Sequence, residues 1–258
     1  MQKHERERYR LHAKLPAYRR NVVRAQELIT RALIEVPGVW AMCASGGKDS
    51  GAMMAMALQT GWSGPVVHYV ARGEMPEENT RLLRELCDRY SLELHEVPVP
   101  GPWEAWEAVG HFFAVPETPE EKAAYRRFEL DWSAANDYAE QQGWVGQFMG
   151  MRKEESKRRS MVLGKRGGLY KTQSRSTWTC CPLMQWKGPD IWACLLENDM
   201  PWLSVYDDAP RGREMERSEF TWFEESLWRH GQVQEFRQRF PERWARLCAR
   251  WPEIRSFA

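Results

Sequence analysis

The sequence predicts an α/β protein with a doubly wound, parallel, five-stranded sheet and helical extensions at its N- and C-terminal ends. Short apolar runs over 39–44, 65–70, 92–97 and 145–149 have the length of buried strands. Between the first three runs, residues 51–58 are rich in the helix formers Ala and Met, and 77–90 repeat Leu and Cys at helical spacing. Strands that alternate with helices in this way form parallel sheets with crossover helices.

The ends of the chain are expected to be helical. Residues 17–35 place apolar side chains at helical spacing, so 1–36 is predicted to be an N-terminal helical extension of the α/β domain at 37–200. The C-terminal part, 201–258, is Trp-rich and is predicted to be helical and packed on that domain.

Two segments interrupt the alternation of strands and helices. Residues 98–143 contain five prolines and are predicted to be an insert, acidic in charge, with a helix over 119–142. Its role is left open, as a cover for the site or a surface for a partner. Residues 160–179 contain three glycines and many polar side chains, which predicts a loop or hairpin.

Composition limits the class of protein. The chain has 258 residues, 43% of them hydrophobic and 28% charged, which is ordinary for a globular domain. No apolar run approaches the ~20 residues that span a bilayer, so no membrane is expected. The N-terminal stretch MQKHERERYRLHAK lacks the apolar core of a secretory signal, so the protein is expected in the cytoplasm with reduced cysteines.

Charge is unevenly spread along the chain although the net charge is only +1. Residues 1–31 hold nine Lys/Arg against three Asp/Glu, and 150–180 hold nine against two. The first excess is typical of a solvated helix face. The second lies among glycines and aromatic residues, so a surface for DNA, another nucleic acid or phosphate is an equal alternative there.

The stretch Ala44-Ser45-Gly46-Gly47-Lys48-Asp49-Ser50 separates the first strand from the helix that follows it. A strand-to-helix turn would explain the glycines and serines. An anion site explains the lysine as well, because glycines let the backbone approach an anion and the helix directs its unpaired N–H groups at it. The loop is not of the Walker A type, since Met42 and Asp49 occupy positions where that pattern needs Gly and Ser/Thr.

Four segments, in order, resemble the adenine nucleotide alpha-hydrolase superfamily and its phosphoadenylyl sulfate (PAPS) reductase-like family. Ser45–Ser50 resembles the superfamily's pyrophosphate loop. Glu74-Met75-Pro76-Glu77 keeps the continuation of the second motif, although Ala71-Arg72-Gly73 replaces its Asp-Thr-Gly and puts a metal or ribose role there in doubt. Gly150–Arg159 matches Gly-x-Arg-x-x-(Glu/Gln)-Ser-x-x-Arg, and Pro182–Trp192 matches Pro-Leu-x-x-Trp-x-x-x-Asp-Val-Trp.

The resemblance implies a Rossmann-like fold and a set of site residues. The residues implied to act in catalysis are Lys48, Asp49, Arg152, Cys180 and Cys181. Those implied to bind the nucleotide and its pyrophosphate are Ala44, Ser45, Gly46, Gly47, Lys48, Asp49, Ser50, Gly150, Arg152, Ser156 and Arg159. Asp49 is expected to help place Mg²⁺ through bound ATP, or to cap the helix. The Cys180-Cys181 pair is expected to carry sulfur, with simple packing as an equal alternative.

The Lys-Asp pair of the loop matches the ATP-using members of the superfamily. The implied activity is an ATP pyrophosphatase that adenylates a substrate oxygen for sulfur incorporation, and the chain resembles the ATP pyrophosphatase of DNA phosphorothioation systems. ATP and Mg²⁺ are the expected cofactors, and a cysteine desulfurase or other sulfur donor is the expected partner. An iron–sulfur cluster is not expected, and a homodimer is left open.

Two other functions stay open. The first is a sulfonucleotide (PAPS or adenylyl sulfate) reductase or an ATP sulfurylase-like subunit. A reductase of this family needs a nucleophilic cysteine near its C-terminus, whereas this chain ends in RWPEIRSFA and its last cysteine, Cys248, has the setting of a packed helix residue. The second is a non-catalytic nucleotide-binding module of a larger complex.

Overall fold

The structure is a computed structural model that describes residues 1–71, 77–99, 118–120, 123, 133–171, 177–207, 209, 212–216, 234, 237–238 and 240–257. The chain divides into two compact units. The first comprises Met1–Val70, Met75–Val97 and Ser133–Glu219, and the second contains the remaining segments, including Phe220–Ala258.

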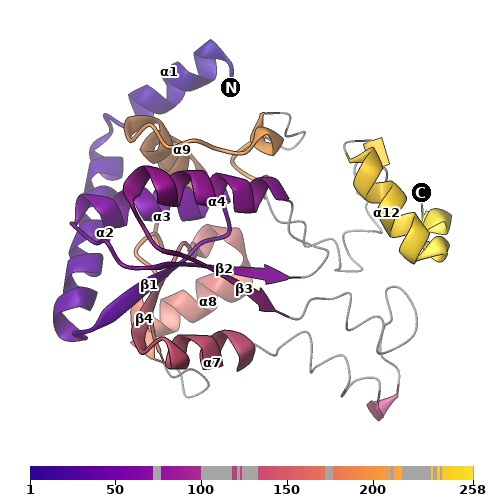
Figure 1. Cartoon of the computed structure of the whole chain (residues 1–258). Coiled ribbons are helices and arrows are strands. Elements are labelled where there is room, and N and C mark those ends of the chain that lie inside the picture. Colours follow the sequence, from indigo (N-terminus) through magenta and orange to yellow (C-terminus); the bar gives the residue numbers. More distant parts are fainter. Residues whose placement is uncertain are drawn as a thin grey trace. The chain divides into compact units, whose positions relative to one another are not determined.

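A six-stranded sheet in the order β3-β2-β1-β4-β6-β5 forms the centre of the fold (Figure 1). β1 pairs in parallel with β2 and β4, and β4 pairs in parallel with β6. The expected α/β class is confirmed. The expectation of five parallel strands missed one, because the short β5 joins the edge antiparallel to β6. The strands are β1 (Val39–Cys43), β2 (Val66–Ala71), β3 (Leu94–Val99), β4 (Trp144–Met149), β5 (Leu169–Lys171) and β6 (Trp178–Cys180).

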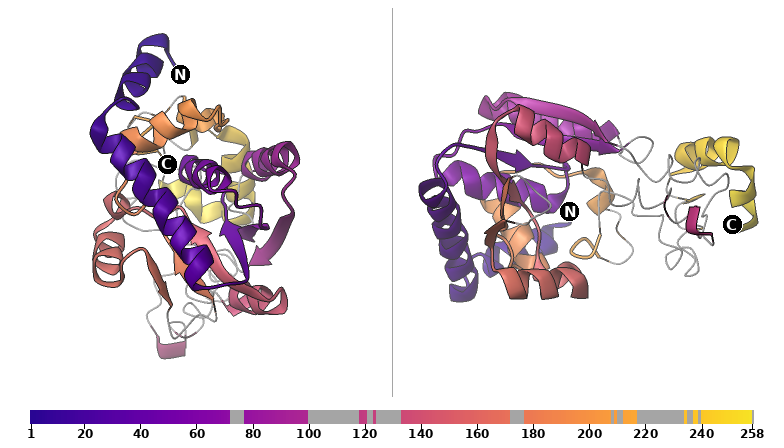
Figure 2. Two further views of the ribbon diagram at one scale, coloured as in Figure 1. Left: turned by 90° about the vertical axis from the view of Figure 1, so that its left-hand side faces the viewer. Right: turned by 90° about the horizontal axis from the view of Figure 1, so that it is seen from below.

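Helices of the first unit flank this sheet, and the N-terminal helix packs on another helix (Figure 2). They are α1 (Lys3–His12), α2 (Pro16–Glu35), α3 (Lys48–Gln59), α4 (Glu77–Tyr90), α7 (Ser133–Gln141), α8 (Lys157–Arg166) and α9 (Gly188–Glu197), with 3₁₀ turns η1 (Lys153–Glu155) and η2 (Ser204–Tyr206). The expected helices at 17–35 and 77–90 are confirmed to within one residue. α7 confirms the C-terminal part of the expected helix at 119–142, whereas residues 121–122 and 124–132 of that helix, and most of the insert, lie outside the described residues.

The expectation of a loop or hairpin over 160–179 was wrong in its first half. Residues up to Arg166 belong to α8, in which the hydroxyl of Ser156 accepts the Arg159 N–H at 3.1 Å and so caps the N-terminal end. Gly167 ends the helix with a φ of 75°. Only the antiparallel β5–β6 pair corresponds to the expected hairpin.

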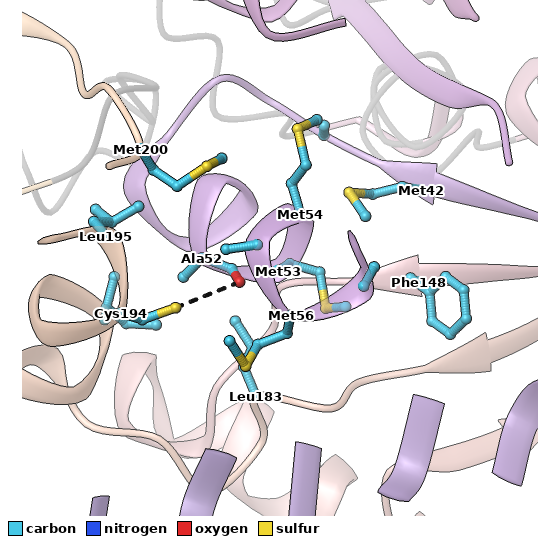
Figure 3. Close-up of a cluster of buried hydrophobic side chains, with 14 of the residues drawn as sticks. Met42, Ala52, Met53, Met54, Met56, Phe148, Leu183, Cys194, Leu195 and Met200 are labelled. Carbon is cyan, nitrogen blue, oxygen red and sulfur yellow. Dashed lines mark hydrogen bonds between the residues drawn. The ribbon is translucent and has the colours of Figure 1, made fainter. Parts of the chain in front are cut away.

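The position of α3 in the core explains why its residues are small or apolar. Every residue from Ser50 to Ala57 is buried, because α3 packs against α2, α9 and the sheet. Figure 3 shows Met53, Met54 and Met56 of this helix among side chains of the sheet and of α9. The Cys194 thiol approaches the Ala52 carbonyl at 3.8 Å. The helix that begins at the loop is therefore fixed on all sides.

The described part of the second unit contains α12 (Pro241–Arg250) and the 3₁₀ segment η3 (Pro252–Phe257). Its apolar contacts come from Leu247, Cys248, Trp251 and Ile254, each at most 7% exposed. The boundaries expected at residues 36 and 200 stay predictions. Among the described residues, no helix has the length and apolar character needed to cross a membrane.

Candidate functional site

The order of the strands locates the candidate site. From β1 the chain builds outward through β2 to β3, whereas β4 lies on the other side of β1 and leads to β6. The direction of winding therefore reverses between β1 and β4. In open α/β sheets, ligands bind at the carboxyl ends of the strands on either side of such a reversal. The two segments at this place are the loop 44–47 after β1 and residues 150–152 after β4.

The loop after β1 has the backbone of an anion site. Gly46 has a φ of 77°, and a Cβ at this position would lie 2.6 Å from the Asn79 carbonyl oxygen, so only glycine fits. Gly47 is the N-cap of α3, which begins at Lys48. The amides of the first turn have no acceptor within the helix, which is the feature of a helix N-terminus that binds anions.

The serines of the loop support its backbone. The Ser45 hydroxyl lies 3.4 Å from the Gly47 amide nitrogen. The Ser50 hydroxyl donates to the Gly47 carbonyl at 2.8 Å. These contacts shape the turn, and phosphate binding by either hydroxyl stays a prediction.

Buried polar groups of β2 and α4 hold the loop from behind. Asn79 is 1% exposed and donates from Nδ2 to the Ser45 carbonyl at 2.8 Å. His68 is fully buried, with Nδ1 2.9 Å from the Ala44 carbonyl and Nε2 3.1 Å from the Thr80 hydroxyl. A carbonyl oxygen only accepts, so the His68 proton is on Nδ1. Burial lowers the pKa of His68, against the opposing effect of the Ala44 carbonyl, and favours this neutral form.

Lys48, Asp49 and Arg152 come together in front of the loop. Asp49 accepts from Arg152 Nε at 2.6 Å through Oδ1, and its Oδ2 lies 3.2 Å from Lys48 Nζ. Lys48 is 4% exposed and Arg152 3% exposed. Burial alone would lower the pKa of Arg152, but Asp49 and Glu155, with a hydrogen bond to Glu154, outweigh it, and the pKa lies above its usual value. Arg152 therefore stays charged in a buried position.

The segment after β4 is positioned by close packing on α3. A Cβ at Gly150 would lie 2.9 Å from the Asp49 carbonyl oxygen, so glycine permits the two segments to meet. The Glu154 carboxylate accepts from Arg152 Nη1 at 2.7 Å and from the Gly188 amide, at the start of α9, at 2.7 Å. The guanidinium of Arg152 is thus fixed between α3 and α9.

Arg159 joins the same group of charges indirectly. Its Nη1 forms an ion pair with Glu155, whose Oε2 also accepts from the Arg152 amide at 2.8 Å. Ser156 lies between these residues and caps α8. The structure brings both near the end of β4, and their contact with phosphate stays a prediction.

Cys180 and Cys181 lie in the core. Both are 0% exposed, and no disulfide joins any of the six cysteines. The Cys180 sulfur lies 3.9 Å from the Leu28 carbonyl of α2. Burial, reinforced by Cys181 and partly offset by Arg31, raises the pKa of Cys180 well above its usual value. This geometry favours packing, and sulfur transfer by the pair stays a prediction.

The carboxylate of Asp49 does not fit a direct magnesium ligand in this arrangement. Each of its oxygens faces a cation, one Arg152 and the other Lys48. Within the described ranges, no group of three or more His, Cys, Asp or Glu could hold a metal ion. Mg²⁺ binds proteins mainly through substrate phosphates and one or two carboxylates. The expected metal role of Asp49 stays a prediction, and no step below depends on it.

Comparison with known proteins identifies the family. Residues 40–240 match the sequence profile of the phosphoadenosine phosphosulfate reductase domain. The chain belongs to this family. A search of curated protein sequences gives no match. The superfamily expected from the four motifs, the adenine nucleotide alpha-hydrolases, is confirmed.

A solved structure shares the fold. The PAPS reductase of Candida auris, in its phosphate complex, superposes with a TM-score of 0.51 at 14% identity, over 80% of this chain and 92% of that one. The NMN synthetase of Francisella tularensis superposes with a TM-score of 0.46 at 16% identity, over 71% of each chain. A U34-tRNA thiolase of Methanococcus maripaludis, with its [4Fe-4S] cluster, superposes with a TM-score of 0.48 at 12% identity. The match covers 93% of this chain and 76% of that one. Members of this family bind nucleotides and are enzymes that act on ATP or sulfonucleotides.

Four residues that the sequence did not single out contribute to the site. His68, Asn79 and Glu154 support the loop and Arg152, and Tyr206 contacts Lys48. A histidine inside the apolar run PVVHYV is a local signal that could have been used for His68. Tyr206 offers no such signal, because its contact spans 158 residues of sequence.

Proposed function

We propose that the chain is an ATP pyrophosphatase that adenylates a substrate oxygen, most specifically in DNA phosphorothioation. The observation that carries the proposal is the group formed by buried Lys48 and Arg152 with partly exposed Asp49 at the N-terminal end of α3, where the winding of the sheet reverses. Two cations and the amides of a helix start form a strong site for a polyphosphate. Of the substrates on which this family acts, ATP is the one that carries a polyphosphate.

The proposed reaction is an in-line displacement at the α-phosphorus. The substrate oxygen forms a bond to that phosphorus, the bond to the oxygen bridging the α- and β-phosphates breaks, and pyrophosphate leaves. Lys48, Arg152 and the first amides of α3 stabilise the charge that grows on the pyrophosphate. Asp49 and Glu154 hold Arg152 in place before the nucleotide arrives, so no reorganisation is needed during the step.

Adenylation prepares the oxygen for replacement by sulfur. A sulfur nucleophile attacks the activated centre, and the oxygen leaves as part of AMP. The burial of Cys180 and Cys181 does not support a carrier thiol on this chain. We therefore propose that the sulfur comes from a separate donor protein, such as a cysteine desulfurase.

DNA as the substrate is supported by α8. Its side chains Lys157, Arg158, Lys165 and Arg166 are exposed, and the helix begins five residues after Arg152 in the sequence. Exposed cations of this kind bind the phosphate backbone of nucleic acids. The phosphates of a bound DNA would then lie near the proposed adenylation site.

A sulfonucleotide reductase is the second candidate, because the family profile carries that name. Such a reductase needs a nucleophilic cysteine. Five of the six cysteines are buried and Cys43 is partly exposed. Burial, with Asp88 adding to it, raises the pKa of Cys87 to about 11, and burial also raises that of Cys194. These thiols are protonated at neutral pH, which disfavours the reductase.

The test is the release of pyrophosphate from ATP and Mg²⁺, with and without DNA. We expect Lys48→Ala to lower the rate on the order of a hundred- to a thousandfold, as the loss of a preorganised group that stabilises charge does. Lys14→Ala, which changes an exposed lysine outside the site, is the control. Release of sulfite from PAPS with thioredoxin would favour the second candidate. Binding of ATP without turnover would favour a non-catalytic nucleotide-binding module.

A further inference from the structure

One segment of the chain supplies two ligands to Lys48. The hydroxyl oxygen of Tyr206, the last residue of η2, accepts a hydrogen bond from the Lys48 amide at 3.0 Å. The carbonyl oxygen of Glu216 accepts from Lys48 Nζ at 2.6 Å. The Tyr206 ring also lies 5.3 Å from Nζ. All of these residues belong to the first unit.

The Tyr206 hydroxyl and the Glu216 carbonyl accept hydrogen bonds from the two groups of Lys48 that a polyphosphate would bind. The Lys48 amide is the first of α3, and Nζ is the positive charge of the loop. A well-aligned N–H group directs its hydrogen at one acceptor near 3 Å. A phosphate oxygen that binds the Lys48 amide must therefore take the position of the Tyr206 hydroxyl.

The segment that carries these ligands is fastened to α1. Arg213 is 6% exposed and pairs with Glu5 at 3.0 Å and with Asp207 at 3.2 Å. Glu214 accepts from Arg8 at 2.6 Å and from the Tyr9 hydroxyl at 2.9 Å. The described residues between Tyr206 and Glu216 thus have their own anchor, independent of Lys48.

We propose that Tyr206 and the Glu216 carbonyl are internal ligands of the nucleotide site, which the phosphates of a bound nucleotide replace. The inference rests on the proposed nucleotide binding, and it does not depend on the reaction that follows. The protein then has two states, one in which Tyr206 and the Glu216 carbonyl bind Lys48 and one in which Lys48 is available to the nucleotide. The apparent affinity for the nucleotide is lowered by the population of the first state. Tyr206 becomes a residue that sets nucleotide affinity by competition.

The test is calorimetric binding of ATP with Mg²⁺, and of inorganic pyrophosphate, to wild type and Tyr206→Phe. The variant keeps the ring that packs 5.4 Å from Trp192 and loses only the competing oxygen. A net hydrogen bond of ordinary strength corresponds to affinity that is about three- to tenfold tighter for both probes. Arg8→Gln, which weakens the anchor on α1, should shift affinity in the same direction by a smaller factor.

Tyr18→Phe is the matched control, since this buried tyrosine loses a hydrogen bond to Glu197 outside the loop. Its affinity should equal that of wild type. Unchanged or weaker binding by Tyr206→Phe overturns the inference while leaving the proposed function in place. Failure of wild type and all three variants to bind either probe overturns both the inference and the proposed function.

Hydrogen exchange gives a second readout that needs no variant. Peptides of the wild-type protein that contain Tyr206 or Glu216 should exchange faster when ATP is added, because their contacts with Lys48 are lost. Slower exchange would show that the segment closes over the nucleotide and would overturn the inference.

Discussion

Arg152 connects the two halves of the candidate site. It follows β4, pairs with Asp49 of α3, and reaches the start of α9 through Glu154. The resemblance of Gly150–Arg159 to the family motif implied a place for Arg152 in the site, because that motif is local in sequence. Its partners could not be predicted in the same way. Whether Asp49 faces a metal, a helix amide or an arginine depends on which strands become neighbours.

His68 illustrates the limit of local reasoning at the residue scale. Within an apolar run, a single histidine is typical of a strand core. Its hydrogen bonds to Ala44 and Thr80 exist only because β2 lies beside β1 and α4 folds back over it. The residue supports the loop without being near it in sequence.

The buried neutral state of His68 has a consequence for stability. Its pKa is lowered in the folded protein, so below its usual value near 6.5 the unfolded chain takes up a proton that the folded protein does not. Stability therefore falls as pH drops through this value, by up to about 1.4 kcal/mol per pH unit for one proton. His68→Asn keeps a hydrogen-bond donor for the Ala44 carbonyl and removes the titratable imidazole.

We expect urea unfolding between pH 7.5 and 5.5 to show a steeper loss of free energy of unfolding for wild type than for His68→Asn. Equal losses for the two proteins would mean that His68 is not held neutral. His68→Ala, which removes the donor as well, should be less stable than His68→Asn at both pH values.

At the scale of elements, the path of β1, the loop and α3 follows from the sequence. Gly46 has a positive φ, and the Ala- and Met-rich helix packs against the sheet, α2 and α9. The sequence was misleading for α8, because three glycines in 160–179 suggested a loop. In the structure Gly164 lies inside the exposed helix and Gly167 ends it. A single glycine weakens a helix without preventing it.

Gly150→Ala tests the contact between β4 and α3. The added Cβ would lie 2.9 Å from the Asp49 carbonyl oxygen, so Arg152 and Asp49 must move apart. A shift of this kind is expected to lower kcat/KM for ATP on the order of a hundredfold.

Gly164→Ala is the matched control for this substitution. No atom lies within 4 Å of a Cβ at that position, so kcat/KM should not change. The exposed helix should gain roughly 0.5–1 kcal/mol of stability. Equal kinetic effects of the two substitutions would contradict the assigned contact.

At the scale of the whole molecule, the order of the sheet creates the site. Four short motifs, spread from Ser45 to Trp192, indicated the superfamily, and the family match over 40–240 confirms it. The meeting of the loop after β1 with the segment after β4 requires β4 to pair with β1 across more than 100 residues. The antiparallel β5 was expected only as part of the loop-or-hairpin alternative, because an edge strand of three residues has almost no periodic signal.

The basic helix α8 gives a prediction about DNA binding. Replacing exposed Lys165 and Arg166 with Gln should weaken DNA binding and make the slope of log K against log salt less negative by about two, since each phosphate contact contributes about 0.9. The pair Arg20→Gln and Arg24→Gln, exposed on α2, is the control and should leave the slope unchanged. Fluorescence anisotropy over a range of salt concentrations measures both.

The central claim is that the site at the start of α3 binds ATP and directs cleavage between its α- and β-phosphates. ATP labelled at the γ-phosphate tests this most directly when the products of wild type and Lys48→Ala are separated and counted. The label should appear in pyrophosphate with wild type and stay in ATP with the variant. Label in inorganic phosphate, or an equal yield of pyrophosphate from both proteins, would contradict it.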